Sequence, residues 1–139
     1  MCMWIYKDKK INSHDDLHPD CTDIVYLLTF ESGRAYIGKK GVRAIRKRPP
    51  LKGKKLNRRI LTNLQFVSYE GSSEEIENEI ILSKEIFHQC SNKRTATYIE
   101  AGWLFEVDAL FNPLYLNKNI GGVYFDNAMS GYLEGYYND

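Results

Sequence analysis

The chain has 139 residues, of which 43% are hydrophobic and 27% charged, and its net charge is +1. This length and apolar content predict a single domain, residues 1–139, with one core that folds without disulfides or metals. Three cysteines are too few for a disulfide framework, no apolar run approaches the roughly 18 residues of a membrane span, and no signal-peptide pattern opens the chain. We therefore expect a cytoplasmic protein with no membrane partner.

The small net charge hides a concentrated basic segment. Residues 39–59 contain eleven Lys or Arg and no acid, although the whole chain holds 19 basic and 18 acidic side chains. A solvated charged face is the alternative interpretation, but such a face normally mixes both signs. A segment of one sign predicts a polyanionic partner.

Residues 1–11 are expected to form a short hairpin that covers an edge or one end of a sheet. Trp4, Tyr6 and Ile11 suit strands, and the polar residues between them suit a turn. Residues 12–23 are polar and predict a surface loop. Four ligand-type side chains allow a zinc site as an alternative, although their spacings match no common zinc finger: they are His18, Cys21, His88 and Cys90.

Residues 24–39 predict a β-hairpin. The first run is rich in Val, Leu, Thr and Tyr, which suit a strand, and Ser32-Gly33 marks the turn. The hairpin would place Tyr26 and Tyr36 near each other across the strand pair. The segment that leaves the second strand would then deliver Arg46.

The basic segment predicts mainly helix. Residues 41–48 predict a short helix that Pro49-Pro50 stops, and residues 51–55 predict a flexible basic loop. Residues 56–64 again have helical spacing of their apolar side chains. Residues 69–73 predict a turn, and a Ser there would cap a short helix that reaches about Ile80.

The C-terminal half predicts one long helix. Residues 81–90 are ambiguous between a continued helix and a third strand. Ser91 or Thr95 would cap the next helix, which is expected to end near Phe111. Its apolar stripe consists of Ile99, Trp103, Val107 and Leu110. A Gly- and Tyr-rich tail, residues 121–139, follows.

Two triplets in the predicted hairpin resemble the paired motifs of the GIY-YIG nuclease family. Tyr36-Ile37-Gly38 matches the second motif, and Ile24-Val25-Tyr26 resembles the first with Ile24 in place of the usual Gly and Val25 in place of Ile. Arg46 follows Gly38 at the family's typical spacing. Tyr98–Leu104 looks like the helix that carries the family's metal-binding Glu, here Glu100, and Tyr115-Leu116-Asn117 looks like its Asn segment.

The resemblance spans about residues 24–120 and is closest to small phage-type members. Four segments occur there in the same order: Tyr36–Lys40, Pro49–Lys55, Tyr69–Ser73 and Ile99–Ala101. It implies an α/β fold with a small, mostly antiparallel three-stranded sheet flanked by helices. Residues 81–90 would be the third strand, and the N-terminal hairpin would be an addition.

The resemblance also implies a metal-dependent DNA endonuclease, a phosphodiester hydrolase. Glu100 would hold Mg²⁺ or Mn²⁺, and Glu79 and Glu85 fit that role less well. The tyrosines would act as the base and its positioning partner, in an order that the sequence does not decide. The candidate catalytic residues are Tyr26, Tyr36, Lys39, Lys40, Arg46, Glu100 and Asn117.

Among these, Arg46 would pair with phosphate through its planar guanidinium. Lys39 or Lys40 would take the auxiliary basic role that other members give to a His or Tyr, because Pro50 stands in the region where many carry that His. Asn117 would hold a loop or a phosphate.

The other basic side chains of the segment are expected to bind the DNA backbone: Arg43, Lys47, Arg48, Lys52, Lys54, Lys55, Arg58 and Arg59. Phosphate contacts carry no sequence information, so low sequence specificity is expected. The substrate would be duplex or branched DNA, bound by a monomer or homodimer. Two alternatives remain: a catalytically inactive nucleic-acid-binding protein on the same fold, and a protein-binding inhibitor that uses the aromatic tail.

Overall fold

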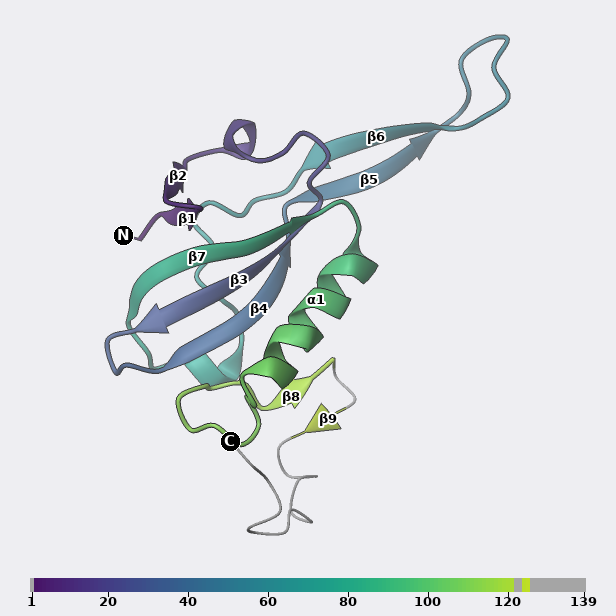
Figure 1. The fold of residues 1–139 in the computed structure, drawn as a ribbon. Helices are drawn as coiled ribbons and strands as arrows, with labels where there is room; N and C mark the ends of the chain where they lie inside the picture. The colour runs from purple at the N-terminus through teal and green to yellow at the C-terminus, as the bar shows by residue number, and fades with distance from the viewer. Residues whose placement is uncertain (1, 122–123, 126–139) are drawn as a thin grey trace.

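The computed structural model describes residues 2–121 and 124–125 (Figure 1). Its centre is a five-stranded sheet in the order β2-β1-β7-β3-β4. The predicted three-stranded sheet is confirmed as β7-β3-β4, which is antiparallel throughout. The strands are β1 (Trp4–Tyr6), β2 (Lys9–Ile11), β3 (Asp23–Phe30), β4 (Ala35–Gly41) and β7 (Ile81–Cys90).

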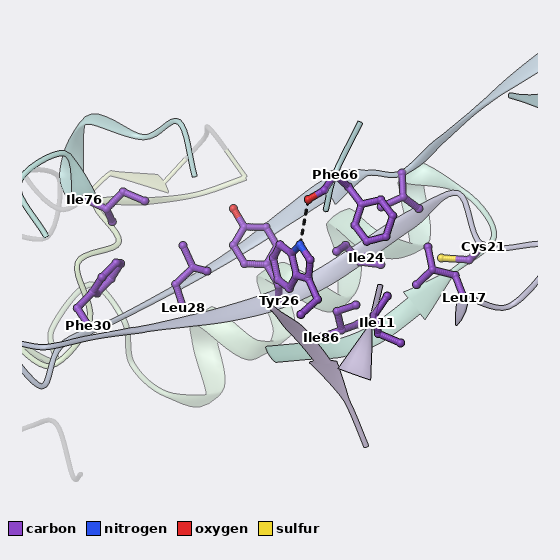
Figure 2. Close-up of a cluster of buried hydrophobic side chains, with 12 residues drawn as sticks. Ile11, Leu17, Cys21, Ile24, Tyr26, Leu28, Phe30, Phe66, Ile76 and Ile86 are labelled. Atoms are coloured by element: carbon purple, nitrogen blue, oxygen red, sulfur yellow. Dashed lines mark hydrogen bonds between the residues drawn. The ribbon is translucent and has the colours of Figure 1, made fainter. Parts of the chain in front are cut away.

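The N-terminal hairpin is also confirmed, and it extends the sheet. Its turn residues Lys7 and Asp8 have φ angles of 47° and 68°, which match a tight two-residue hairpin turn. β1 then pairs parallel with β7 and covers the edge of that strand. The Trp4 indole donates a hydrogen bond to the Phe66 carbonyl at 2.9 Å and so ties the hairpin to the loop across the sheet (Figure 2).

β3 is the middle strand of the β7-β3-β4 part of the sheet and is buried on both faces. Its even-numbered side chains, including Tyr26, join a core with Trp4 and Phe66 (Figure 2). On its opposite face, Val25 and Leu27 join a second core beneath the helix. The alternation of a pleated strand therefore supplies both cores from one β-branched and aromatic run.

Helix α1 (Lys93–Glu106) covers the second face of the sheet (Figure 1). Asn92 is its cap, in place of the predicted Ser91 or Thr95, and its side chain accepts the Thr95 N–H at 2.8 Å. The helix ends at Glu106 rather than near residue 111, because Asp108 takes a left-handed conformation (φ 53°) and the chain turns back there. The four side chains of the predicted apolar stripe do pack against the second core.

The other face is covered by a loop, residues 64–80, and not by a helix. The short helix expected up to Ile80 is a single 3₁₀ turn, η2 (Glu74–Ile76), capped by Ser73. It stops early because the Ile80 carbonyl already accepts the Glu31 N–H, at 2.8 Å, and leads the chain into β7.

The helices predicted at residues 41–48 and 56–64 are wrong. These segments form the antiparallel strands β5 (Arg43–Arg48) and β6 (Arg58–Asn63). The buried Val42 and its neighbour Arg43 both donate their N–H groups to the Thr22 carbonyl, so β4 continues as extended chain into β5. We call residues 43–63 the basic ribbon; it projects from the end of the sheet at which α1 begins (Figure 1).

Two short strands, β8 (Asn119–Ile120) and β9 (Tyr124–Phe125), pair after the helix. The rest of the aromatic tail lies outside the described residues, so the inhibitor hypothesis, which depends on it, falls outside them too. Within the described residues, no helix has the length and apolar character needed to cross a membrane.

Lys84 fixes the covering loop from within the first core. Its side chain is 1% exposed, and its ammonium donates to the carbonyls of Val67 and Tyr69 at 3.0 and 2.8 Å. Burial lowers the pKa of Lys84. We expect Lys84→Met to lower the free energy of unfolding by about 2–4 kcal/mol, because two inward-facing carbonyls lose their donor.

Urea denaturation measures this loss. Lys9→Met, at an exposed position of β2, is the control and should change stability by less than about 0.5 kcal/mol. Equal unfolding midpoints for the two variants would contradict a supporting role for Lys84.

Candidate active site

The two motif tyrosines lie on the same face of the sheet. In the β3–β4 register, Tyr26 pairs with Gly38 and Leu28 pairs with Tyr36, so the tyrosines are diagonal neighbours. A Cβ built on Gly38 would lie 2.5 Å from the Tyr26 Oη and 2.6 Å from its Cζ. The Tyr26 phenol therefore rests on the bare backbone of Gly38, which gives a physical reason for glycine there.

Burial raises the pKa of both phenols, which are neutral at pH 7. Tyr26 is 2% exposed, and desolvation is the main cause that raises its pKa, with smaller contributions from Tyr69, Tyr36 and Glu100. Desolvation also raises the pKa of Tyr36, which the Ser73 hydroxyl partly offsets. In the metal-free protein the two side chains are thus neutral hydrogen-bonding groups, which orient water better than they accept its proton.

Glu100 faces the sheet from α1. It stands one helical turn from Ala96 and one from Leu104, and both of these are buried in the second core. Burial raises the pKa of Glu100, and the nearby Lys39 ammonium counteracts this effect. The carboxylate in turn helps to raise the pKa of both tyrosines, so the three acidic groups share one electrostatic neighbourhood.

Lys39 and Lys40 point to opposite faces of β4, as successive strand residues do. Lys39 reaches the helix side, where its ammonium donates to the Thr97 Oγ1 at 2.6 Å. Lys40 lies on the tyrosine side, with its Nζ 4.9 Å from the centre of the Tyr69 ring. Only Lys39 is therefore placed to balance the charge of Glu100.

Tyr69 is a site residue that the sequence interpretation missed. Its ring meets the Tyr26 ring edge-on, with 6.0 Å between the centroids, and Lys40 covers it. The segment 69–73 was predicted as a turn, and that pattern gives no direction for the side chain. The hydrogen bond from Lys84 to the Tyr69 carbonyl sets the direction of the Tyr69 side chain. No local sequence motif predicts this bond.

Asn117 completes the edge of β4. Its buried amide donates to the Ile37 carbonyl at 2.7 Å and accepts the Ile37 N–H at 3.1 Å. Leu116 and Ala35 add a backbone bond at 2.9 Å beside it. The Asn117 side chain thus takes the place of the backbone of a neighbouring strand at the edge of β4. It fixes the backbone of Ile37, between Tyr36 and Gly38.

We expect Asn117→Ala to lower the free energy of unfolding by about 2–4 kcal/mol, because both polar groups of Ile37 lose their partner. Asn117→Asp should be nearly as harmful, since a carboxylate accepts the N–H but repels the carbonyl. Thermal unfolding measures both variants. Unchanged melting temperatures would show that water replaces the amide and that Asn117 does not hold β4.

A profile described as "Putative endonuclease segE, GIY-YIG domain" matches residues 4–120. The chain belongs to the GIY-YIG endonuclease family. No curated protein and no solved structure matches the chain. The first GIY-YIG motif has Ile24 in place of the usual Gly. This replacement leaves the tyrosine site unchanged, because Ile24 is fully buried in the first core, away from the Tyr26 hydroxyl (Figure 2).

Two arginines of the basic ribbon in this GIY-YIG domain donate hydrogen bonds to main-chain carbonyls outside the ribbon. Arg43 donates to the carbonyls of the 14–21 loop, with distances of 2.7 to 3.2 Å, and Arg59 donates to the Ser91 carbonyl at 3.1 Å. These two arginines hold the protein together. Arg46 is exposed on β5, and in the described part of the chain no hydrogen bond or ion pair joins it to Tyr26 or Glu100.

A zinc site finds no support within residues 2–121 and 124–125, where no three His, Cys, Asp or Glu side chains gather as metal ligands. Glu100 offers one carboxylate, whose charge acts on both tyrosine phenols. Mg²⁺ and Mn²⁺ prefer oxygen ligands, and Mg²⁺ usually keeps several waters with only one or two carboxylates. The donor set of the GIY-YIG site therefore fits such an ion.

Proposed function

We propose that this GIY-YIG protein is a metal-dependent DNA endonuclease that hydrolyses phosphodiester bonds. The observation that carries the proposal is the position of Glu100, which faces the sheet and influences the ionisation of both tyrosines. An isolated tyrosine hairpin would support only phosphate binding. A half-buried carboxylate whose charge acts on both tyrosines provides a place for a cation where phosphate charge develops.

The residues divide the chemistry among them. Glu100 would hold Mg²⁺ or Mn²⁺, and the bound ion supplies positive charge at the phosphoryl oxygens and lowers the pKa of water. Tyr36 is the more exposed phenol and orients the attacking water. Tyr26, whose phenol packs on the backbone of Gly38, orients Tyr36. Lys39 balances the charge of Glu100, and Lys40 contributes positive charge on the tyrosine side.

The charge distribution orients the DNA. The basic ribbon carries nine Lys or Arg and no acid, whereas residues 70–79 carry five Glu and no base. A hollow of about 740 Å³ is lined by Glu70 and Glu74 among others, and it would repel a phosphate backbone. The DNA therefore lies over the ribbon, where Arg46 pairs with the scissile phosphate.

Six other basic residues of the ribbon contact the DNA around the scissile phosphate: Lys47, Arg48, Lys52, Lys54, Lys55 and Arg58. Affinity from phosphate contacts is salt-dependent, and the nuclease centre itself has low sequence specificity. A single domain from residue 1 to residue 139, acting as a monomer or homodimer in the cytoplasm of a phage-infected host, completes the proposal.

Incubation with supercoiled plasmid tests the function. We expect nicking in Mg²⁺ or Mn²⁺, and none when EDTA removes the ion. Plasmid binding should weaken steeply between low and physiological salt. Binding without nicking in every divalent ion would establish the catalytically inactive alternative.

A further inference from the structure

The basic ribbon contains two consecutive pairs of like charges. Lys47 lies directly opposite Arg59, and Arg48 lies directly opposite Arg58. Like charges at directly opposed positions destabilise a strand pair. No acid within the ribbon relieves the repulsion, so the paired form of this segment is suited to a polyanion.

The two faces of the ribbon differ in their contacts. One face carries Arg43 and Arg59, which bind backbone carbonyls of the domain and fix the ribbon to it. The other, which we call the free face, consists of Ala44, Arg46, Arg48, Arg58, Ile60 and Thr62. In the part of the chain that the structure describes, side chains of the free face make hydrogen bonds only within the ribbon, to the carbonyls of Pro49 and Ala44.

The dimensions and side chains of the free face suit contact with base edges in the major groove of DNA. A two-stranded ribbon fits the major groove of B-form DNA, which is about 12 Å wide and 8.5 Å deep. The Cβ atoms of opposed residues such as Arg48 and Arg58 lie about 5 Å apart, within reach of two base pairs stacked about 3.4 Å apart. Ile60 and the Thr62 methyl beside them suit contact with thymine methyl groups.

Rigidity distinguishes this ribbon from a basic arm that only tracks phosphates. Phosphate contacts need charge but no fixed register, whereas base contacts need the guanidinium forks in set positions. The Arg58 Nε donates to the Pro49 carbonyl at 3.2 Å, which orients its fork and leaves the terminal nitrogens available. The anchors on the opposite face keep the whole ribbon in place.

We propose that the free face lies in the major groove of duplex DNA, where Arg48 and Arg58 read guanine edges beside the cleavage site. This proposal rests on the proposed DNA-cleaving function and goes beyond it by naming duplex DNA as the substrate and two adjacent base pairs as the origin of a sequence preference. The lysines of the 49–57 loop hold phosphates beyond the groove. The ribbon starts two residues after β4, so groove position and cleavage position are linked.

Selection from a pool of randomised 24-base-pair duplexes, in EDTA so that nothing is cut, tests the proposal. The wild-type protein should enrich guanine at two or three neighbouring base pairs. Replacing these guanines with 7-deazaguanine, which lacks the N7 acceptor, should weaken binding about tenfold. Single-stranded DNA and duplex RNA of the same length should bind more weakly than the duplex, because neither offers a wide major groove.

The matched variants are Arg48→Lys with Arg58→Lys, which keep the charge and remove the forks, and Lys52→Ala with Lys54→Ala, which remove loop charge only. The arginine variant should lose the enrichment and bind the unselected pool within about threefold of wild type. The lysine variant should keep the enrichment and bind all duplexes more weakly. No enrichment by the wild type, or unchanged enrichment by the arginine variant, would overturn groove reading and leave the nuclease function intact. Failure to bind any DNA would overturn the nuclease function itself.

Discussion

Glu100→Gln is expected to slow plasmid nicking about 10³-fold, equal to about 4 kcal/mol of lost transition-state stabilisation. The amide keeps the size of the side chain but lacks the charge that attracts a divalent ion. DNA affinity in EDTA should stay within about twofold of wild type, since the basic ribbon is untouched. Glu106→Gln, at an exposed position in the last turn of the same helix, is the control and should nick normally.

A measurement of stability distinguishes a direct loss of nicking by Glu100→Gln from a loss caused by unfolding. Burial raises the pKa of Glu100, so its ionised form at pH 7 costs folding free energy that the neutral amide does not. The Gln variant should therefore unfold at the same urea concentration as wild type or a higher one. The difference should shrink as the pH falls through the raised pKa toward the ordinary value for Glu. Equal nicking by wild type and variant would remove Glu100 from the metal site.

Gly38→Ala should lower both activity and stability. The added methyl would occupy the position of the Tyr26 phenol, and Tyr26 is walled in by Trp4 and Tyr69, at centroid distances of 5.3 and 6.0 Å. We expect an unfolding cost of about 1–3 kcal/mol from overpacking and a fall in nicking of about 10²-fold from the displaced hydroxyl.

Gly102→Ala is the matched control, since a Cβ at that helix position meets only open space. It should stabilise α1 by about 0.5–1 kcal/mol and leave nicking unchanged. Chemical denaturation and plasmid nicking measure both substitutions. Normal nicking by Gly38→Ala would show that the hydroxyl of Tyr26 has no fixed role.

The tyrosine hairpin could be predicted from the sequence because its signals are local, whereas Glu100 was selected through the resemblance to the GIY-YIG family. β3 is a nearly continuous run of residues that suit a strand, and the second motif keeps the glycine over which Tyr26 lies. The helical positions of Ala96, Glu100 and Leu104 follow from a spacing of four. The fold around these motifs could therefore be inferred without knowledge of distant contacts.

The basic ribbon was mistaken for helices because its decisive contact is not local. The apolar residues of 56–64 satisfy helical spacing, and a continuous basic run shows no period at all. The strand pairing depends on Val42, which is buried in the first core and bonded to Thr22. Tyr69 was missed for a similar reason, since the buried Lys84 of β7, which is distant in the sequence, binds its carbonyl and positions it.

A crystal structure of the protein with duplex DNA and Mn²⁺, located by anomalous diffraction, tests the central claim most directly. We predict one Mn²⁺ within about 2.2 Å of a Glu100 carboxylate oxygen, close to the Tyr36 hydroxyl and a DNA phosphate. An ion bound only at the acidic residues 70–79, with Glu100 unligated, would contradict the claim that Glu100 and the two tyrosines form one catalytic centre.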